Sequence, residues 1–321
     1  MTHYDRNGEI DAVRAAAHWR SLSPYVGGVL VPGSTGDGWE ITKDERRQLL
    51  RIGIKLASKL NFQILIGTLH PDADETLALI QDDMAWLKAE FGQGDAIDVL
   101  QKANVCGFTV CGPRGKELTQ EQIGRALNSV LELGLPTAVY QLPQVTQNEL
   151  SPELAADLAQ QNENFIFFKD SSGSDKVALS GKNLEGVFTA RGAEGDYARW
   201  LKINSGPYEG FLLASANCFA RELQEVIAHI SAGRLDAGRQ LSNRLTAAIG
   251  DTMKLASGLP DGNAFANANK AIDHFLAHGP KAAGVAPPRL HAGTALPLDF
   301  LRSTEAILRR EKLLLATGYL E

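Results

Sequence analysis

Short apolar runs alternate with longer amphipathic stretches along most of this chain, and this alternation restricts the fold more than any other feature. Runs bounded by Gly, Pro or polar residues are typical of buried strands, and the stretches between them have helical periodicity. Repeated strand–helix–strand units predict an α/β fold with a parallel sheet, and eight such units close into a (β/α)8 TIM barrel. Seven runs are present, at residues 28–32, 62–67, 105–110, 136–140, 165–169, 187–191 and 210–213.

The beginning of the barrel is the part that the sequence supports least. Residues Glu9 to Leu22 are expected to form the first helix, so the first strand would fall at Met1 to Asp5, which is short for a strand. We therefore expect a short or truncated first strand, or missing upstream residues. The barrel, with the active site and a helical insertion at about residues 84–104, is expected to cover residues 1–218, and C-terminal helices packed on it to cover residues 219–321.

The composition excludes several classes of partner. The chain has 321 residues, of which 44% are hydrophobic and 22% charged, as in soluble globular proteins with a sizeable core. Its net charge of -6, with acidic residues spread along the chain, provides no basic surface for nucleic acid. No apolar run approaches the length of a membrane span. The three scattered cysteines argue against a disulfide framework and favour a cytoplasmic protein.

Lys169 follows the apolar run of residues 165–168 and is the first candidate for chemistry. In a parallel α/β fold this strand would deliver the amine to the carboxyl ends of the strands, where such enzymes place their active sites. A lysine that loses hydration there favours the neutral, nucleophilic amine that Schiff-base enzymes need. The alternative is a lysine at the rim of the sheet whose flexible stem carries the ammonium to water.

A loop rich in glycine and hydroxyl groups, from Gly33 to Gly38, follows the first clear strand. Its hydroxyls and backbone amides suit an anion, and its candidate binding residues are Ser34, Thr35 and Gly36. The loop is neither a GxGxxG nor a Walker motif, so a nucleotide site is not expected. The alternative is an ordinary turn between strand and helix.

Tyr140 ends the strand that precedes the strand of Lys169. A tyrosine hydroxyl can both donate and accept a proton, so Tyr140 is a candidate proton relay; the alternative is an aromatic plug at the top of the barrel. Neighbouring strands lie about 4.8 Å apart, so Tyr140 and Lys169 at adjacent strand ends can reach the same substrate atom.

Three motifs in this order resemble those of one enzyme family. Gly33 to Asp37 is similar to the loop Gly-Ser/Thr-Thr-Gly-Glu, Tyr140 to Pro143 is similar to Tyr-Asn-x-Pro, and Lys169 to Gly173 is similar to Lys-Glu-x-Ser-Gly. With these motifs the chain resembles the dihydrodipicolinate synthase / N-acetylneuraminate lyase family of class I, Schiff-base-forming aldolases. Order and spacing agree from about His3 to Cys218.

The resemblance implies a mechanism and an assembly. Lys169 would condense with the ketone of pyruvate or another 2-oxo acid, and Tyr140 would relay protons. The substrate carboxylate would be held by Ser34, Thr35 and the Gly36 amide, and the carbonyl of Gly192 would face the site. The resemblance also implies a homo-oligomer, dimer or tetramer, and neither a cofactor nor a metal is expected.

Two departures from the family argue against dihydrodipicolinate synthase itself. The synthase has Thr-Pro-Tyr-Tyr after its fourth strand, whereas Cys111 to Lys116 contains no aromatic residue. Val145 stands where the synthase has an arginine for its aldehyde substrate. We hypothesise that Arg114 or Lys116 replaces one of these contacts and recognises a different acidic substrate.

Other polar residues are expected to be structural. His274 and His278 are spaced for one helix face, but no further ligands converge, so a solvated face is expected rather than a metal site. Asp82 and Asp83 are expected to be exposed, and Cys111 is expected to be a small strand residue. Residues 42–45 are expected to form a helix capping box.

Four functions remain open from the sequence. The leading one is a lyase or aldolase that makes or breaks a carbon–carbon bond in a 2-oxo acid through the Lys169 Schiff base. A dehydratase or deaminase of a 2-oxo acid would use the same lysine. Dihydrodipicolinate synthase proper is the third. The altered fourth loop and short first strand also fit a non-catalytic, metabolite-binding barrel.

Overall fold

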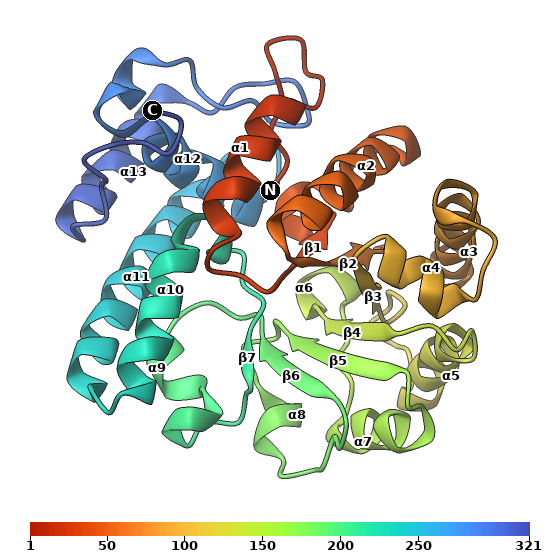
Figure 1. The fold of residues 1–321 in the computed structure, drawn as a ribbon. Coiled ribbons are helices and arrows are strands. Elements are labelled where there is room, and N and C mark those ends of the chain that lie inside the picture. The colour runs from red at the N-terminus through yellow and green to blue at the C-terminus, as the bar shows by residue number, and fades with distance from the viewer.

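A curled parallel sheet forms the centre of the protein in the computed structural model, which describes residues 1–321. Its seven strands follow chain order, each hydrogen-bonded to the next, and curve round as Figure 1 shows. The strands are β1 (Gly28–Val31), β2 (Gln63–Gly67), β3 (Val105–Cys111), β4 (Thr137–Gln141), β5 (Phe165–Asp170), β6 (Phe188–Arg191) and β7 (Gly210–Phe211). The α/β fold is therefore confirmed as seven parallel strands in a curled sheet. Because β1 and β7 do not pair, the eighth strand that would close the expected barrel is not formed.

The predicted first strand does not form. Residues Met1 to Asp5 contribute only one isolated antiparallel bridge, between Tyr4 and Ile10. The side of the sheet between β1 and β7 stays open, and helices α1 (Ala12–Leu22) and α10 (Ala216–Ser231) contact each other beside it. The N-terminus lies next to β1 in Figure 1.

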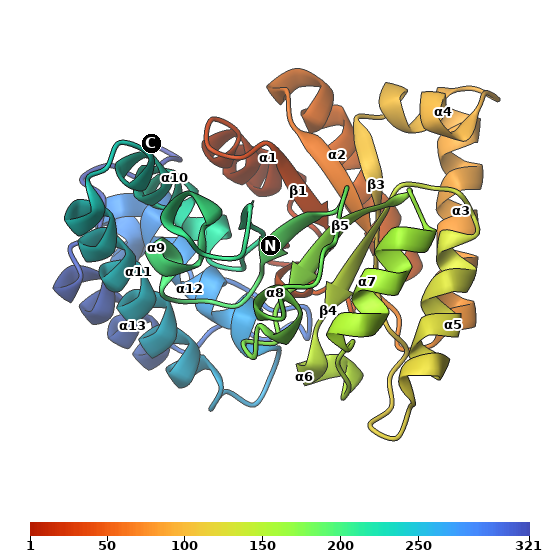
Figure 2. The ribbon, with the colours of Figure 1, turned by 90° about the horizontal axis from the view of Figure 1, so that it is seen from below.

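Helices cover the outside of the sheet and continue into a C-terminal bundle, as the second view shows (Figure 2). The remaining helices are α2 (Lys43–Leu60), α3 (Ala73–Phe91), α4 (Ala96–Lys102), α5 (Gln120–Leu131), α6 (Pro143–Thr146), α7 (Pro152–Gln161), α8 (Lys176–Leu179), α9 (Tyr197–Trp200), α11 (Leu235–Ala256), α12 (Ala264–His278) and α13 (Leu298–Arg310). Three short 3₁₀ turns are η1 (Ser34–Gly36), η2 (Lys202–Asn204) and η3 (Gly279–Gly284). No helix is long and apolar enough to cross a membrane.

Local sequence signals set several helix ends. The capping box predicted at Thr42 is confirmed, since its hydroxyl accepts from the Glu45 amide and the Glu45 carboxylate accepts from the Thr42 amide. Thr119 forms a second capping box at the start of α5. The end of α3 and the short helix α4 occupy residues 84–104, where a helical insertion was expected.

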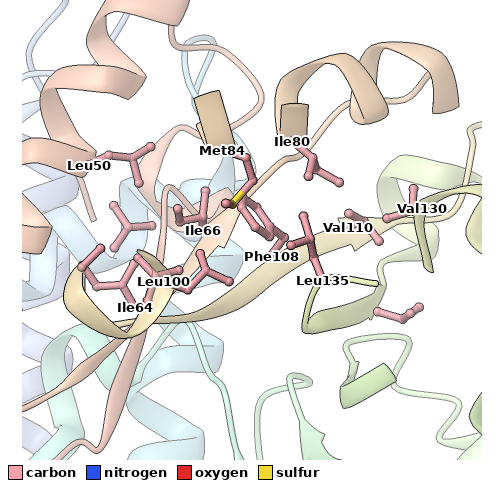
Figure 3. Packing of buried hydrophobic residues seen from close by; sticks show 14 of the residues in the cluster. Leu50, Ile64, Ile66, Ile80, Met84, Leu100, Phe108, Val110, Val130 and Leu135 are labelled. Carbon is pink, nitrogen blue, oxygen red and sulfur yellow. The ribbon is translucent and has the colours of Figure 1, made fainter. Parts of the chain in front are cut away.

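The main apolar core lies between the sheet and its outer helices. Figure 3 shows Ile66 of β2 and Phe108 of β3 packed against Met84 of α3 and Leu100 of α4. A second apolar cluster joins α10 to α13. Helix α10 runs through the expected boundary at residue 218, so the division into residues 1–218 and 219–321 remains a prediction.

The expectation that Asp83 is exposed is wrong. Asp83 is fully buried on α3, where the Arg46 guanidinium from α2 donates to it at 2.6 Å. Arg46 also donates to the Gly67 carbonyl at 3.0 Å, so it connects two helices to the end of β2. Asp82 beside it does reach the surface, where it pairs with Lys43. The sequence shows two adjacent aspartates, but only the distant arginine decides which one is buried.

Replacing Arg46 with methionine should destabilise the protein by about 3–5 kcal/mol, because Asp83 would stay buried without its two closest hydrogen bonds and would keep only the Arg47 guanidinium at 3.4 Å. Urea unfolding measures the change. The matched control Lys43→Met breaks an exposed pair and should cost about 1 kcal/mol or less. An equal effect of the two substitutions would contradict the role given to the buried pair.

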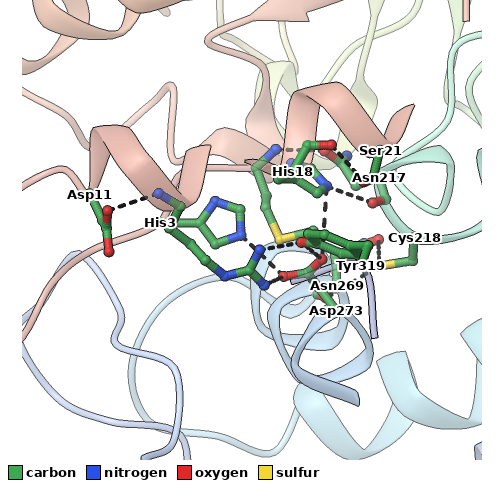
Figure 4. Close-up of polar contacts among 11 residues, drawn as sticks. His3, Asp11, His18, Ser21, Asn217, Cys218, Asn269, Asp273 and Tyr319 are labelled. Atoms are coloured by element: carbon green, nitrogen blue, oxygen red, sulfur yellow. Dashed lines mark hydrogen bonds and ion pairs between the residues drawn. The ribbon is translucent and has the colours of Figure 1, made fainter. Parts of the chain in front are cut away.

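Polar side chains tie the N-terminal segment to the C-terminal helices (Figure 4). Asp273 on α12 accepts from Tyr319 at 2.7 Å, lies 3.1 Å from Nε2 of His3, and pairs with Arg14. His18 on α1 lies 2.7 Å from the Asn217 carbonyl through its Nε2. Burial lowers the pKa of His3 to about 4 and that of His18 to about 3, so both rings are neutral at pH 7.

The protein should therefore lose stability in mild acid. Below pH 6.5 the unfolded chain binds protons at His3 and His18, whereas the folded chain keeps both rings neutral to lower pH. The contribution of these two histidines to the free energy of unfolding is therefore complete above pH 6.5 and falls towards pH 4. For His3 the loss is about 3 kcal/mol. Unfolding of His3→Asn in urea at pH 7 and pH 4 should give a smaller difference than the parent chain gives. His229→Gln, outside this cluster, should not change the difference; a parent chain equally stable at both values would contradict the prediction.

Candidate active site

Lys169 and Tyr140 meet at the carboxyl ends of two neighbouring strands. The register pairs Tyr140 of β4 with Lys169 of β5, and paired positions point to the same face of the sheet. The Lys169 Nζ lies 3.9 Å from the centre of the Tyr140 ring. Lys169 is 8% exposed and forms no ion pair with a carboxylate. The amine is therefore available to a ligand that displaces its contact with the ring.

A cavity of about 100 Å³ connects Lys169 with the predicted anion-binding loop. Lys169 lines it together with Ser34, Thr35 and Gly36, and its remaining walls come mainly from β1 and residues 212–214. The cavity lies at the open side of the sheet, between β1 and β7. The structure thus brings together the lysine and the three loop residues that the sequence singled out.

The η1 turn presents a different set of amides from the one expected. The Gly36 amide donates to the Gly33 carbonyl at 2.9 Å, so it is already used within the turn. The amides of Ser34 and Thr35 have no acceptor, and the Thr35 hydroxyl makes no hydrogen bond. The Ser34 hydroxyl accepts from the Trp39 indole at 2.8 Å. An anion would therefore meet Ser34 and Thr35 more directly than the Gly36 amide.

Buried polar and charged side chains fix this turn through Asp37 and the Gly36 carbonyl. Asp37, which ends the turn with φ 60°, accepts from Lys270 at 2.8 Å and from the Tyr4 hydroxyl at 3.0 Å. The Thr2 hydroxyl donates to the Gly36 carbonyl at 2.6 Å. Lys270 is 2% exposed and was not identified from the sequence. Its ion pair with Asp37 distinguishes it from Lys169, which has no such partner.

Gly192 packs directly against the lysine. A Cβ atom at this position would lie 2.1 Å from the Ser171 Oγ and 2.7 Å from the Lys169 Cε. Its amide donates to the Asp170 carbonyl at the end of β5. Gly192 therefore lies beside Lys169, and the close approach explains why a side chain would not fit. The role expected for its carbonyl remains a prediction.

Arg114 is not brought into the cavity. It is exposed in the loop after β3, where its amide donates to the Pro71 carbonyl at 2.8 Å, and Lys116 is exposed as well. Apolar side chains line the other side of Tyr140 instead, since Cys111 and Leu142 pack on it with Val145 at their edge. Cys111, Leu142 and Val145 thus form an apolar wall beside Tyr140. Among these positions, the resemblance implies a polar group in the synthase at Val145.

Neither Cys111 nor the two histidines of α12 provide further chemistry. Burial raises the pKa of the Cys111 thiol to about 12, as suits a packing residue. The expectation that His274 lies on a solvated helix face is wrong, because it is buried and its Nε2 lies 2.9 Å from the Ala282 carbonyl. No group of three or more metal-ligating side chains occurs in the structure.

A buried polar network beside Lys169 was missed by the sequence analysis. The Tyr208 hydroxyl donates to Asp175 at 2.7 Å, and its oxygen also lies 3.2 Å from the Asp170 carboxylate. Arg191, at the end of β6, pairs with Asp175 at 3.0 Å. Burial raises the pKa of Asp170. The sequence signal that could have revealed this network is a charged residue at the end of each of two consecutive apolar runs. These residues are Asp170, after residues 165–169, and Arg191, at the end of residues 187–191.

Glu194 is a second residue that the sequence analysis missed. Its carboxylate accepts from the Ser215 amide at 2.9 Å, from the Ser215 hydroxyl at 2.6 Å and from the Tyr197 hydroxyl at 2.7 Å. These bonds join the loop after β6 to the start of α10. The only local sign of this role in the sequence is that Glu194 lies two residues after Gly192.

The match to a known family agrees with this arrangement. Residues 94–259, slightly more than half of the 321 residues, match the model of the Dihydrodipicolinate synthetase family. The chain belongs to this family. The matched range includes Tyr140, Lys169 and Gly192.

Individual relatives within the family differ in activity. The chain is 24% identical over 249 residues to a 4-hydroxy-tetrahydrodipicolinate synthase of Agrobacterium fabrum, an alignment that covers 76% of this chain and 78% of the relative. It is 27% identical over 226 residues to the probable 2-dehydro-3-deoxy-D-pentonate aldolase YjhH of Escherichia coli, covering 68% of each chain.

Solved structures of the family share the fold. YagE, a prophage protein of the dihydrodipicolinic acid synthase family from E. coli K12, was crystallised in complex with pyruvate. It superposes with a TM-score of 0.74 at 20% identity, covering 97% of this chain and 96% of YagE. KD(P)GA from T. tenax gives a TM-score of 0.72 at 16% identity, covering 97% of this chain and 96% of the other. At these identities the likeness establishes the fold.

Gly192→Ala should displace the Lys169 side chain, because the new methyl group would overlap it and Ser171. On the hypothesis that Lys169 forms a Schiff base, we expect its reaction with pyruvate to be at least tenfold slower, measured as the borohydride-trapped adduct. Gly250→Ala on α11, where a Cβ meets nothing within 4 Å, is the matched control. Equal trapping rates in both variants would mean that Gly192 does not confine the lysine.

Proposed function

We propose that this protein is a class I lyase or aldolase that acts on pyruvate or another 2-oxo acid through a Schiff base on Lys169. One observation carries the proposal: a buried lysine without a carboxylate partner lies 3.9 Å from the Tyr140 ring and shares a cavity with the Ser34–Gly36 turn. A nucleophilic amine, a phenol and an anion-binding turn are the groups that iminium chemistry on a 2-oxo acid needs.

The chemistry follows from these positions. The Lys169 amine attacks the C2 carbonyl, a C–N bond forms, and water leaves to give a protonated iminium. When the C3–C4 bond of a 4-hydroxy substrate breaks, its electron pair moves into the iminium, and Tyr140 relays the proton of the C4 hydroxyl. Protonation at C3 and hydrolysis by water then release the shorter 2-oxo acid and an aldehyde. The amides and hydroxyls of Ser34 and Thr35 hold the substrate carboxylate, and Gly36 lets the chain turn beside it.

The substrate class follows from the relatives and from the wall beside Tyr140. YjhH is a probable aldolase of a 2-dehydro-3-deoxy sugar acid, and YagE binds pyruvate. The apolar wall of Cys111, Leu142 and Val145 lacks the polar groups that the resemblance implies for dihydrodipicolinate synthesis. These points favour cleavage or formation of a 2-keto-3-deoxy acid over synthase activity. A contribution from Arg114 would require a substrate that extends to the rim.

Three further properties belong to the same proposal. We expect the protein to act in the cytoplasm, since its three cysteines are free. We expect a homo-oligomer, dimer or tetramer, as the family resemblance implies. We expect a small 2-oxo acid as its partner, with neither nucleic acid nor membrane involved.

Reductive trapping tests the proposal. Incubation with pyruvate and borohydride should place a stable adduct on Lys169, located by peptide mass spectrometry, and Lys169→Ala should abolish it. Tyr140→Phe should slow trapping by about 100-fold or more, the usual contribution of a positioned proton relay. The ion-paired Lys270 of the same sample serves as an internal control and should stay unmodified.

Each outcome selects among the remaining functions. An adduct together with release of pyruvate from a 2-keto-3-deoxy sugar acid supports the lyase. An adduct with loss of water or ammonia from the substrate instead supports a dehydratase or deaminase. The absence of any adduct on Lys169 contradicts catalysis and favours a metabolite-binding barrel.

A further inference from the structure

A second, larger cavity lies outside the Lys169 site. It has a volume of about 880 Å³ and is bounded by the N-terminal segment, by α12 and by the loop at residues 286–295. This volume is within the range of small-molecule sites. Its walls combine charged groups with the apolar surfaces of Ile10, Pro287 and Pro288. The proposed chemistry at Lys169 makes no use of this cleft.

Two arginines in the cleft have no carboxylate partner. Arg6, in the turn after Tyr4, is exposed and makes no side-chain hydrogen bond. Arg289 enters from the opposite loop and donates only to the Gly293 carbonyl, at 2.6 Å. The two loops face each other, because the rings of Tyr4 and His291 lie 5.8 Å apart. The cleft therefore offers two guanidinium groups from separate segments of the chain.

Hydrogen bonds or ion pairs already engage the carboxylates and the other cations of the cleft, although Asp5 and Asp11 keep their negative charge because only amides contact them. The Asp11 carboxylate accepts from the Arg14 amide, and the Asp5 carboxylate accepts from backbone amides of its own turn. Asp273 pairs with Arg14, and Figure 4 shows its contacts with His3 and Tyr319. Lys270 is paired with Asp37. The free cationic donors that remain for a ligand are the two arginines.

We propose that this cleft binds a small dicarboxylate, with one carboxylate on Arg6 and the other on Arg289. Arginine forms strong, often bidentate hydrogen bonds with carboxylates, and the proline and isoleucine surfaces suit the carbon chain between them. The site is distinct from the Lys169 cavity, although Thr2 lines both. Because Thr2 and Tyr4 bond to Gly36 and Asp37, a bound dicarboxylate lies directly behind the anion-binding turn.

Succinate is the probe, since it has two carboxylates but no oxo group to react with Lys169. Isothermal titration should give one site that binds succinate at least tenfold more tightly than acetate. Arg6→Gln and Arg289→Gln should each weaken succinate binding at least tenfold. The matched control Arg302→Gln removes an exposed arginine of α13, outside the cleft, and should leave binding unchanged.

Trapping with pyruvate keeps this proposal separate from the proposed function, since Arg6→Gln and Arg289→Gln should form the Lys169 adduct normally. Equal succinate affinity in both cleft variants and the parent chain would overturn the dicarboxylate site. Loss of succinate binding in Thr35→Val, with none in the cleft variants, would place the ligand at the Lys169 cavity and also overturn it. Tighter binding of acetate or inorganic phosphate than of succinate would contradict the ligand class.

Discussion

The register of the parallel strands is the constraint on which the candidate site depends. Cys111, Tyr140, Lys169 and Ala190 occupy paired positions on β3 to β6, so their side chains point to one face at one height. A slip of one residue in any pair would turn Tyr140 or Lys169 to the outer face, among the helices. The buried Asp170–Tyr208 hydrogen bond and the Arg191–Asp175 ion pair brace the strand ends that carry this row.

Much of the fold and part of the site could be predicted because the signals are local. Each apolar run matched a strand, and the capping box at Thr42 needs only four neighbouring residues. Lys169 and Tyr140 could be predicted to meet because parallel strands end at one edge of a sheet. The missing pairing between β1 and β7 was not predictable in the same way, since closure depends on whether a further strand occupies the space between them.

The errors share a physical cause, which is that burial of a charged or polar residue depends on a partner far away in the sequence. Asp83 is buried because Arg46 reaches it from another helix, and His274 is buried because η3 folds back over α12. The role of Lys270 was invisible for the same reason, since its partner Asp37 is more than 200 residues away. Within the η1 turn, the sequence did not reveal that the Gly36 amide donates to the Gly33 carbonyl, and its expected contact with an anion remains a prediction.

The hydrogen bond from the Trp39 indole to the Ser34 hydroxyl has a practical consequence. Indole emission is sensitive to the polarity and hydrogen bonding around the ring, and this ring contacts Ser34, which is proposed to hold the substrate carboxylate. Trp39 thus serves as a native optical reporter for the turn. With Trp19, Trp86 and Trp200 changed to phenylalanine, its fluorescence would follow occupancy of the cavity without any added label.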